Sequence, residues 1–151
     1  MIECRTLQVE TDLDVLLALE ENCFDDDRWS AQQLASHLKR PYGTSLLFFK
    51  EGRPCGFILA HVLFDEAELY QIGVDQACRG QGMGRQMLAC LITQLKEREV
   101  CRLMLEVRAS NTPAVSLYES CGFVLDGKRK AYYERQGATE DALLYSYAIS
   151  A

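Results

Sequence analysis

Three glycines at alternate positions, Gly80, Gly82 and Gly84, are the feature of this chain that most directly suggests ligand chemistry. They lie between an apolar run that ends at Val74 and an amphipathic segment that begins near Met83, so they join a predicted strand to a predicted helix. The first N–H groups of a helix have no intrahelical partner, and the helix dipole adds partial positive charge there. Glycine also lets the backbone approach a ligand closely. The sequence therefore predicts a turn that binds phosphate oxygens.

The spacing of these glycines narrows the choice of ligand. A dinucleotide-binding turn would read G-x-G-x-x-G, and a P-loop would continue with Gly-Lys-Ser/Thr, whereas Gly84 is followed by Arg85 and Gln86. The segment from Arg79 to Gly84 instead reads R-x-x-G-x-G, which resembles the pyrophosphate loop of the GCN5-related N-acetyltransferases, a family that binds acetyl-CoA. Taken alone, the loop is about equally well explained as a simple entry into a helix, because short glycine motifs have many false positives.

The elements that must position this turn follow from the periodicity of apolar residues. In the first half we expect a short strand at 1–7, a helix from Asp12 to about Cys23, a second helix that Ser30 caps and that Pro41 and Gly43 end, and strands at 45–49, 55–64 and 66–74. The first two of these three strands flank Glu51–Pro54, which indicates a hairpin.

The second half alternates helices and strands. We expect a helix at 83–98, a strand at 101–107, a helix that begins at Asn111 and ends at Gly122, a strand that opens at 123–125, and runs at 130–133 and 143–149 on either side of a turn at 136–139. The order βααβββαβαββ predicts an α/β protein with one mixed, mostly antiparallel sheet of about seven strands and helices on both faces.

Composition sets further limits on the function. The 151 residues, 48% of them hydrophobic, suit one domain that spans 1–151. A net charge of −6 argues against direct nucleic-acid binding. Seven cysteines without a C-x-x-C pair favour neither a disulfide framework nor a zinc site, and neither histidine has other ligands at metal spacing, so we expect no metal and a reducing cytoplasmic location. No signal peptide or membrane-spanning run is expected.

Several collinear blocks extend the resemblance over nearly the whole chain. They are Trp29-Ser30, Ile72–Asp75, the glycine turn, Leu105–Asn111, Asn111–Phe123, Tyr132-Tyr133 and Glu140–Ala142. On these blocks the chain resembles the RimI branch of the GCN5-related N-acetyltransferases, which acetylates ribosomal-protein N-terminal alanine. The Asn111–Phe123 block is shared with other acetyltransferases of protein amines, whereas the L-E-V-R-A-S-N string at 105–111 favours RimI. The resemblance thus implies the GNAT fold.

The resemblance implies direct transfer of an acetyl group from acetyl-CoA to the N-terminal α-amine of a protein, within a ternary complex. It gives Glu106 the role of base and Tyr118 the role of acid. Glu106 interrupts the apolar pattern of Leu103, Leu105 and Val107, so partial desolvation suits it to proton transfer. At pH 7 about a tenth of an α-amine is neutral, whereas only about 10⁻⁴ of a lysine side chain is. An α-amine therefore needs a weaker base than lysine does.

Each role has a structural alternative. Glu106 could face solvent or pair with Arg108, and Tyr118 could be an ordinary helix-packing tyrosine. Glu68 is the competing base, although it could equally be one member of an acidic patch with Asp65 and Glu66.

The expected contacts to acetyl-CoA come from two segments and one asparagine. Backbone groups of Ile72, Gly73 and Val74 would hold the acetyl and pantetheine groups, and Asn111 would hydrogen-bond the pantetheine or nucleotide portion. The pyrophosphate would lie on Gly80, Gln81, Gly82, Met83, Gly84 and Arg85. Arg85 could instead be a solvated helix cation, and Asn111 a plain N-cap. Family members usually read N-I-A-V where this chain reads Gln71-Ile72-Gly73-Val74, which could alter the local geometry of the strand.

By the same resemblance, residues 24–30 and Tyr132-Tyr133 would select the acceptor. RimI proteins commonly have Pro-Trp-Ser where this chain has Arg28-Trp29-Ser30 after three aspartates, Asp25–Asp27, which could favour a basic peptide or form a solvated loop. The expected partner is a protein N-terminus, most specifically that of an alanine-starting small-subunit ribosomal protein. The alternatives are acetylation of lysine or a small amine, and a non-catalytic acyl-CoA-binding module. The oligomeric state stays open, because an exposed edge after the last strand would permit dimerisation.

Overall fold

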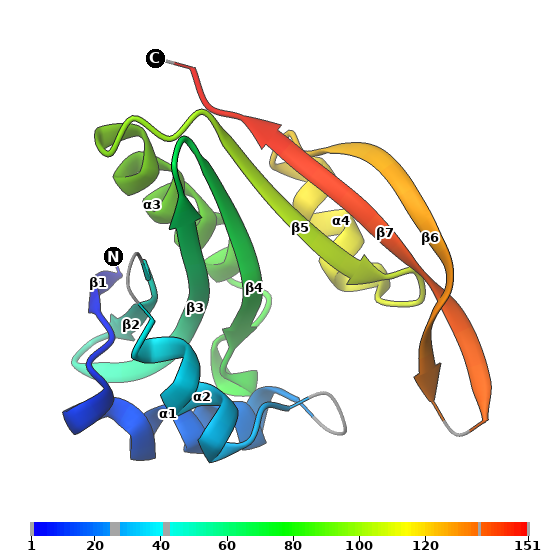
Figure 1. The fold of residues 1–151 in the computed structure, drawn as a ribbon. Helices are drawn as coiled ribbons and strands as arrows, with labels where there is room; N and C mark the ends of the chain where they lie inside the picture. The colour runs from blue at the N-terminus through cyan, green and yellow to red at the C-terminus, as the bar shows by residue number, and fades with distance from the viewer. Residues whose placement is uncertain (1, 25–27, 41–42, 136, 151) are drawn as a thin grey trace.

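A computed structural model describes residues 2–24, 28–40, 43–135 and 137–150. Its centre is a seven-stranded sheet with the order β1-β2-β3-β4-β5-β7-β6 (Figure 1). The strands are β1 (Glu3–Thr6), β2 (Leu46–Lys50), β3 (Arg53–Leu63), β4 (Glu66–Val74), β5 (Arg102–Arg108), β6 (Val124–Arg135) and β7 (Ala138–Ala148). The helices are α1 (Val9–Cys23), α2 (Ala31–Leu38), α3 (Met83–Glu97) and α4 (Thr112–Ser120), with a 3₁₀ turn η1 (Gln76–Cys78). Apart from this turn, the expected order of elements is confirmed.

The sheet is mixed, as expected. Strands β4 and β5 are parallel neighbours joined through α3, and every other neighbouring pair is antiparallel. One expectation was wrong: the last strand, β7, does not form an edge, because it lies between β5 and β6. The edge strands of the sheet are β1 and β6.

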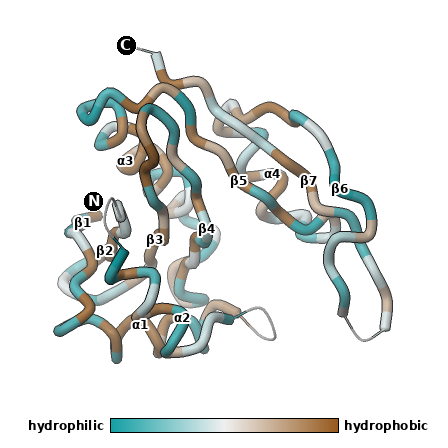
Figure 2. The backbone as a smooth tube through the Cα atoms, viewed as in Figure 1, coloured by the Kyte–Doolittle hydropathy of each residue, from teal (hydrophilic) through white to brown (hydrophobic). Residues whose placement is uncertain are grey.

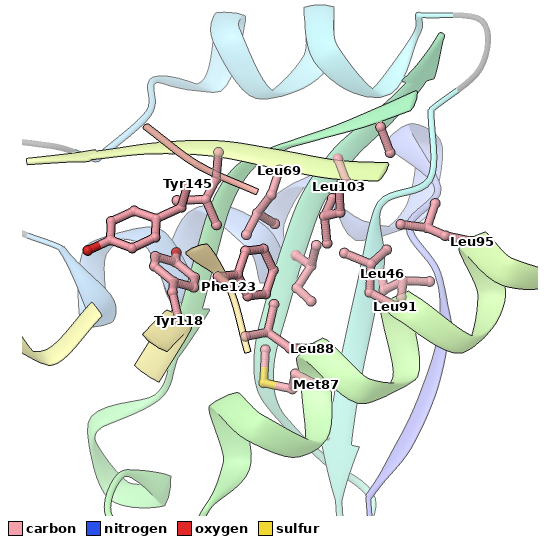
Figure 3. Packing of buried hydrophobic residues seen from close by; sticks show 14 of the residues in the cluster. Leu46, Leu69, Met87, Leu88, Leu91, Leu95, Leu103, Tyr118, Phe123 and Tyr145 are labelled. Carbon is pink, nitrogen blue, oxygen red and sulfur yellow. The ribbon is translucent and has the colours of Figure 1, made fainter. Parts of the chain in front are cut away.

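Helices cover both faces of the sheet because the strands alternate between two apolar clusters. Ile58, Ala60 and Val62 of β3 belong to a large cluster with α3 and α4, whereas Phe57 and Leu59 belong to a smaller cluster with α1 and α2. Figure 3 shows leucines of the sheet packed against the buried side of α3. Figure 2 shows that the far end of the β6–β7 hairpin is mainly hydrophilic. Among the described residues, no helix is long and apolar enough to cross a membrane.

Two helix starts have the caps that their sequences predict. The hydroxyl of Ser30 accepts a hydrogen bond from the backbone N–H of Gln33, whose side chain accepts one from the N–H of Ser30 in return. Asn111 caps α4 by accepting from the N–H of Ala114, and Pro113 lies in the first turn. The expected helix breaker Pro41 lies outside the described residues, as does Gln136 of the last hairpin.

The segments expected at 123–125 and 130–133 belong to one strand. Strand β6 runs from Val124 to Arg135, and its register with β7 shifts between Leu125 and Gly127 and between Arg129 and Tyr133. These irregularities break the alternation of apolar and polar residues, which is why the sequence pattern suggests separate pieces.

A second irregularity shapes the centre of the sheet. Leu59 pairs with Gln71 but Ala60 pairs with Leu69, so Tyr70 is an extra residue on β4. Pairing between β4 and β5 covers only residues 66–69 and 102–105. Beyond Leu69 the two strands diverge (Figure 1), which leaves one side of the end of β4 without a neighbouring strand.

Candidate active site

A cavity of about 740 Å³ lies where the end of β4 meets α3 and α4. Its walls come from the end of α1, the end of β4, the glycine turn and one side of α4: Cys23, Phe24, Ile72–Val74, Arg79, Gly80, Gly82–Arg85, Asn111, Pro113, Ala114, Ser116, Leu117 and Ser120. The structure therefore brings together nearly all the residues expected to contact acetyl-CoA.

The glycine turn has the backbone that an anion cradle requires. Gly80 and Gly82 have φ angles of +77° and +75°, which L-residues with side chains rarely adopt, and a Cβ at either position would meet open space. Gly82 is the N-cap of α3 and supplies no side-chain cap, and the first residues of this helix line the cavity. An anionic diphosphate fits such a helix start.

Two residues of the turn have other tasks. A Cβ on Gly84 would lie 2.9 Å from Cδ2 of Leu117, so this glycine allows α3 to pack closely against α4. Gln81 does not line the cavity; its side chain accepts a hydrogen bond from Lys50 and donates one to the carbonyl of Ala77. Its expected contact with the cofactor could then come only from its backbone.

Two arginines line the same cavity and tie its walls together. Arg79 donates from Nε to the carbonyl of Val74 at 2.9 Å and from Nη2 to the carbonyl of Cys23 at 3.0 Å. Arg85 donates to the carbonyl and the hydroxyl of Ser120, at 3.2 and 3.0 Å. Arg85 is therefore more than a solvated helix cation, because it joins α3 to the end of α4.

The end of β4 explains why this chain has Gly73. A Cβ there would lie 2.6 Å from Cε1 of Phe57 and 3.2 Å from Cε2 of Phe24. Glycine at this position lets both aromatic rings pack against the strand. Ile72 and Val74 lie on the opposite side of β4, where they line the cavity and pack against the cluster that α3 and α4 cover.

A second cavity, of about 290 Å³, shares Phe24, Ile72, Asn111 and Ala114 with the first, so the two are contiguous. Both Glu106 and Tyr118 line it, whereas the competing base Glu68 does not. The two expected catalytic side chains thus face one space, next to the end of β4.

Glu106 is partly buried, with 26% of its side chain exposed, and its partner is not the one considered from the sequence. Its Oε1 lies 3.3 Å from the Nη2 of Arg129 on β6. Arg108 instead forms an ion pair with Glu140 at 3.1 Å. A carboxylate held in a cavity beside one cation is able to accept a proton from a substrate amine.

Tyr118 is almost fully buried on α4, and its ring packs 5.6 Å from that of Phe123 (Figure 3). Burial raises the pKa of its hydroxyl well above the ordinary value. The hydroxyl therefore keeps its proton at physiological pH and is able to donate a hydrogen bond into the second cavity.

Comparison with known proteins decides the family. Residues 11–123 match the Acetyltransferase (GNAT) family. The chain belongs to this family. The [ribosomal protein bS18]-alanine N-acetyltransferase of Escherichia coli K12 is 39% identical over 122 residues, 81% of this chain and 82% of that protein. A putative enzyme of the same description from Bacillus subtilis is 33% identical over 97% of this chain and 95% of its own length.

Structural comparison gives the same result. The crystal structure of the ribosomal-protein-S18-alanine N-acetyltransferase from Escherichia coli superimposes with a TM-score of 0.91 at 35% identity, over 100% of this chain and 96% of that one. The expected GNAT fold and the resemblance to the RimI branch are both confirmed. Members of the GNAT family use acetyl-CoA.

Aromatic rings and charged groups line the second cavity of this acetyltransferase. Trp29, Tyr70 and Tyr133 contribute to its wall, and the guanidinium of Arg108 lies 4.3 Å from the ring centre of Tyr133. Tyr132 lies outside this wall and stacks with Arg129 at 5.2 Å. The expected acidic segment Asp25–Asp27 lies outside the described residues. No group of three or more potential metal ligands occurs among the residues that the structure describes.

The sequence drew attention to Gln71 as a departure from the family pattern, but it indicated neither Glu20 nor the contact between these two residues beside the acetyltransferase site. Glu20 of α1 and Gln71 of β4 are buried and hydrogen-bonded to each other at 2.9 Å. A signal for Glu20 was available, because it follows Leu16 by four residues and so continues the apolar face of α1. A charged residue on a core-facing stripe needs a partner, but the sequence does not indicate which residue supplies it.

Proposed function

We propose that this acetyltransferase transfers the acetyl group of acetyl-CoA to the N-terminal α-amine of a protein, most specifically the N-terminal alanine of ribosomal protein bS18. The observation that carries the proposal is the pair of contiguous cavities, one on the glycine turn and one lined by Glu106 and Tyr118. The names of the relatives, which are bS18-alanine N-acetyltransferases over most of this chain, support the choice of acceptor.

The residues present fit acetyl-CoA as the donor. The start of α3 with Gly80 and Gly82 would receive the pyrophosphate, and Arg85 adds positive charge. The side of β4 that lacks a strand neighbour beyond Leu69 offers backbone groups of Ile72 to Val74 to the pantetheine arm. Bound acetyl-CoA supplies an activated acetyl thioester at this point.

Glu106 would remove the proton of the acceptor ammonium. Among the described residues it is the one carboxylate that lines the second cavity, it is only partly exposed, and its position on β5 holds it opposite the diverging end of β4. A base that serves an α-amine needs to remove a proton from a group with a pKa of about 7.7–8.0, so a carboxylate acting directly or through water is sufficient.

Tyr118 would donate its proton to the leaving sulfur. Its hydroxyl is held protonated by burial, and α4 brings it to the same cavity as Glu106. The proposed base and acid come from different elements, β5 and α4. Each group therefore handles one proton: Glu106 takes the proton of the amine, and Tyr118 gives its own to the sulfur.

The proposal is tested by intact-mass measurement of peptides incubated with enzyme and acetyl-CoA. We expect a gain of one acetyl group on an alanine-starting peptide with a free N-terminus and no gain on the same peptide with a blocked N-terminus and an internal lysine. Acetylation of the blocked peptide would favour the lysine reading. Binding of acetyl-CoA without turnover on any amine would favour the non-catalytic module.

A further inference from the structure

Glu20 is a buried carboxyl group whose hydrogen bonds are unequally distributed. Its side chain is almost completely enclosed at the end of α1. Oε1 accepts two hydrogen bonds at 2.9 Å, one from the backbone N–H of Trp29 and one from Nε2 of Gln71. Within the part of the chain that the structure describes, Oε2 has no hydrogen-bond partner, and neither does Oε1 of Gln71, although both atoms are buried. Two acceptors without donors in one buried pair are costly, because each loses its hydration without compensation.

One proton removes both defects. We propose that Glu20 is a neutral carboxylic acid in the folded enzyme and that its Oε2 hydroxyl donates to Oε1 of Gln71. The acid and the amide then form a closed ring of two hydrogen bonds, since Nε2 of Gln71 already donates to Oε1 of Glu20. Trp29 keeps its hydrogen bond to the same Oε1 atom.

The surroundings of Glu20 favour the neutral form. Burial raises the pKa of this carboxyl above its usual value, and its two hydrogen bonds only partly oppose the shift. The neighbouring charged and titratable groups are Glu21 and Arg28, which line the same small surface cavity, Cys23 on α1, and, beside Trp29, Tyr70 of β4 and His37 of α2. Among the ion pairs of the described residues, none includes Glu20.

The ring gives Glu20 a positioning role in acetyl transfer, an inference that rests on the proposed function. It fastens the backbone of Trp29, which lines the acceptor cavity, to the residue that precedes Ile72 on β4. Ionisation of Glu20 would remove the donor to Gln71 and place an unpaired charge in the core. We therefore expect acceptor binding, and not acetyl-CoA binding, to weaken as Glu20 ionises.

The first test measures folding and needs no activity. The variant Glu20→Gln preserves a donor and an acceptor without a charge, and Glu21→Gln makes the same change at an exposed neighbour. Because a carboxyl with a raised pKa contributes less stability as the pH rises towards that pKa, the melting temperature of wild type should fall relative to Glu20→Gln from pH 6 to pH 9. We expect a relative change of about 3 °C or more, and none for Glu21→Gln.

The second test separates acceptor from donor binding. Glu20→Ala leaves Gln71 and the N–H of Trp29 without a partner, so the KM for an alanine-starting peptide should rise about tenfold, while the KM for acetyl-CoA stays within about twofold. Glu20→Gln should restore the peptide KM at pH 7. The peptide KM of wild type is divided by that of Glu20→Gln at each pH. Ionisation of the peptide amine affects both values equally and so cancels from this ratio.

The two tests separate the failure of this inference from the failure of the proposed function. If Glu20→Gln lowers the melting temperature by the same amount at every pH, or more at high pH, Glu20 is a structural anion and the ring does not form. If the melting curves behave as expected but no peptide is acetylated, the ring stands and only the proposed acceptor is wrong.

Discussion

At the scale of single residues, Glu106 lines the second cavity and forms an ion pair with Arg129 of β6, which does not line it. Arg129 is half exposed and also lies over the ring of Tyr132, so it is able to move towards solvent when a cationic ammonium approaches Glu106. The carboxylate therefore has a cationic neighbour in the free enzyme and would exchange it for the substrate amine.

Replacing the proposed base tests this reading. Glu106→Gln keeps the shape of the side chain but cannot accept a proton, so kcat should fall by about 10²–10⁴-fold. The thermal shift that acetyl-CoA causes should be unchanged, since Glu106 does not line the cavity on the glycine turn. The matched variant is Glu68→Gln on β4, outside the second cavity, which should retain kcat within about threefold. If the two variants exchange these results, Glu68 is the base.

The proposed acid makes a different prediction, about pH. Burial raises the pKa of Tyr118, so the neutral hydroxyl persists to higher pH than in a free tyrosine, and no loss of the acid is expected below about pH 10. Tyr118→Phe should therefore lower kcat by a factor that stays constant from pH 6 to pH 9. A factor that shrinks as the pH rises within this range would show that the tyrosine titrates there and contradict the assignment.

At the scale of elements, the sequence predicts the fold well wherever local signals coincide. The caps at Ser30 and Asn111 and the apolar stripe of α3 mark helix ends and faces within the chain itself, so those elements are confirmed nearly residue by residue. The extra residue at Tyr70 and the insertion of β7 between β5 and β6 depend on partners distant in sequence. No local pattern encodes them, and the shape of the site depends on both.

The same contrast holds for the site residues. The residues of the glycine turn were predictable because their motif is contiguous in the sequence, but the reasons for the individual glycines were not. Gly84 and Gly73 avoid contact with Leu117 and Phe57, which lie 33 and 16 positions away in the chain, whereas Gly80 and Gly82 adopt positive φ. One glycine-rich segment thus combines packing requirements and positive φ angles that its sequence alone does not separate.

Two alanine substitutions separate these requirements. Gly84→Ala places a Cβ 2.9 Å from Leu117 and should destabilise the protein by about 1–3 kcal/mol, and Leu117→Ala in the same chain should recover part of that loss. In Gly82→Ala the added Cβ meets open space, but the residue must keep a left-handed backbone, at a cost of about 1–2 kcal/mol. Melting curves and acetyl-CoA titrations of Gly84→Ala and Gly82→Ala, each with and without Leu117→Ala, separate the two requirements: Leu117→Ala should not rescue Gly82→Ala. If it does, both glycines serve packing.

At the scale of the whole molecule, the sheet consists of two parts with a narrow connection. Strands β1 to β4 form one part and β5, β7 and β6 the other, and only residues 66–69 pair with 102–105 across the boundary. The larger apolar cluster continues across this boundary beneath α3 and α4, so the two parts share a core although their strands diverge (Figures 1 and 3). The divergence leaves backbone groups of β4 available to a ligand without exposing that core.

A donor that lies along β4 should protect precisely those groups that lack a strand partner, and hydrogen exchange measures this directly. Saturating acetyl-CoA should slow exchange both in the glycine turn, at residues 80–85, and at the amides of residues 70–74 that face β5. Adenosine 3′,5′-bisphosphate carries the nucleotide end without the pantetheine arm, so at equal saturation it should leave the β4 amides unprotected. At equal occupancy the two ligands stabilise the whole chain against unfolding to a similar extent. Only the difference between the two exchange maps therefore reports on local protection. Identical maps would mean that the end of β4 does not receive the pantetheine arm, and the gap between β4 and β5 would then have no part in donor binding.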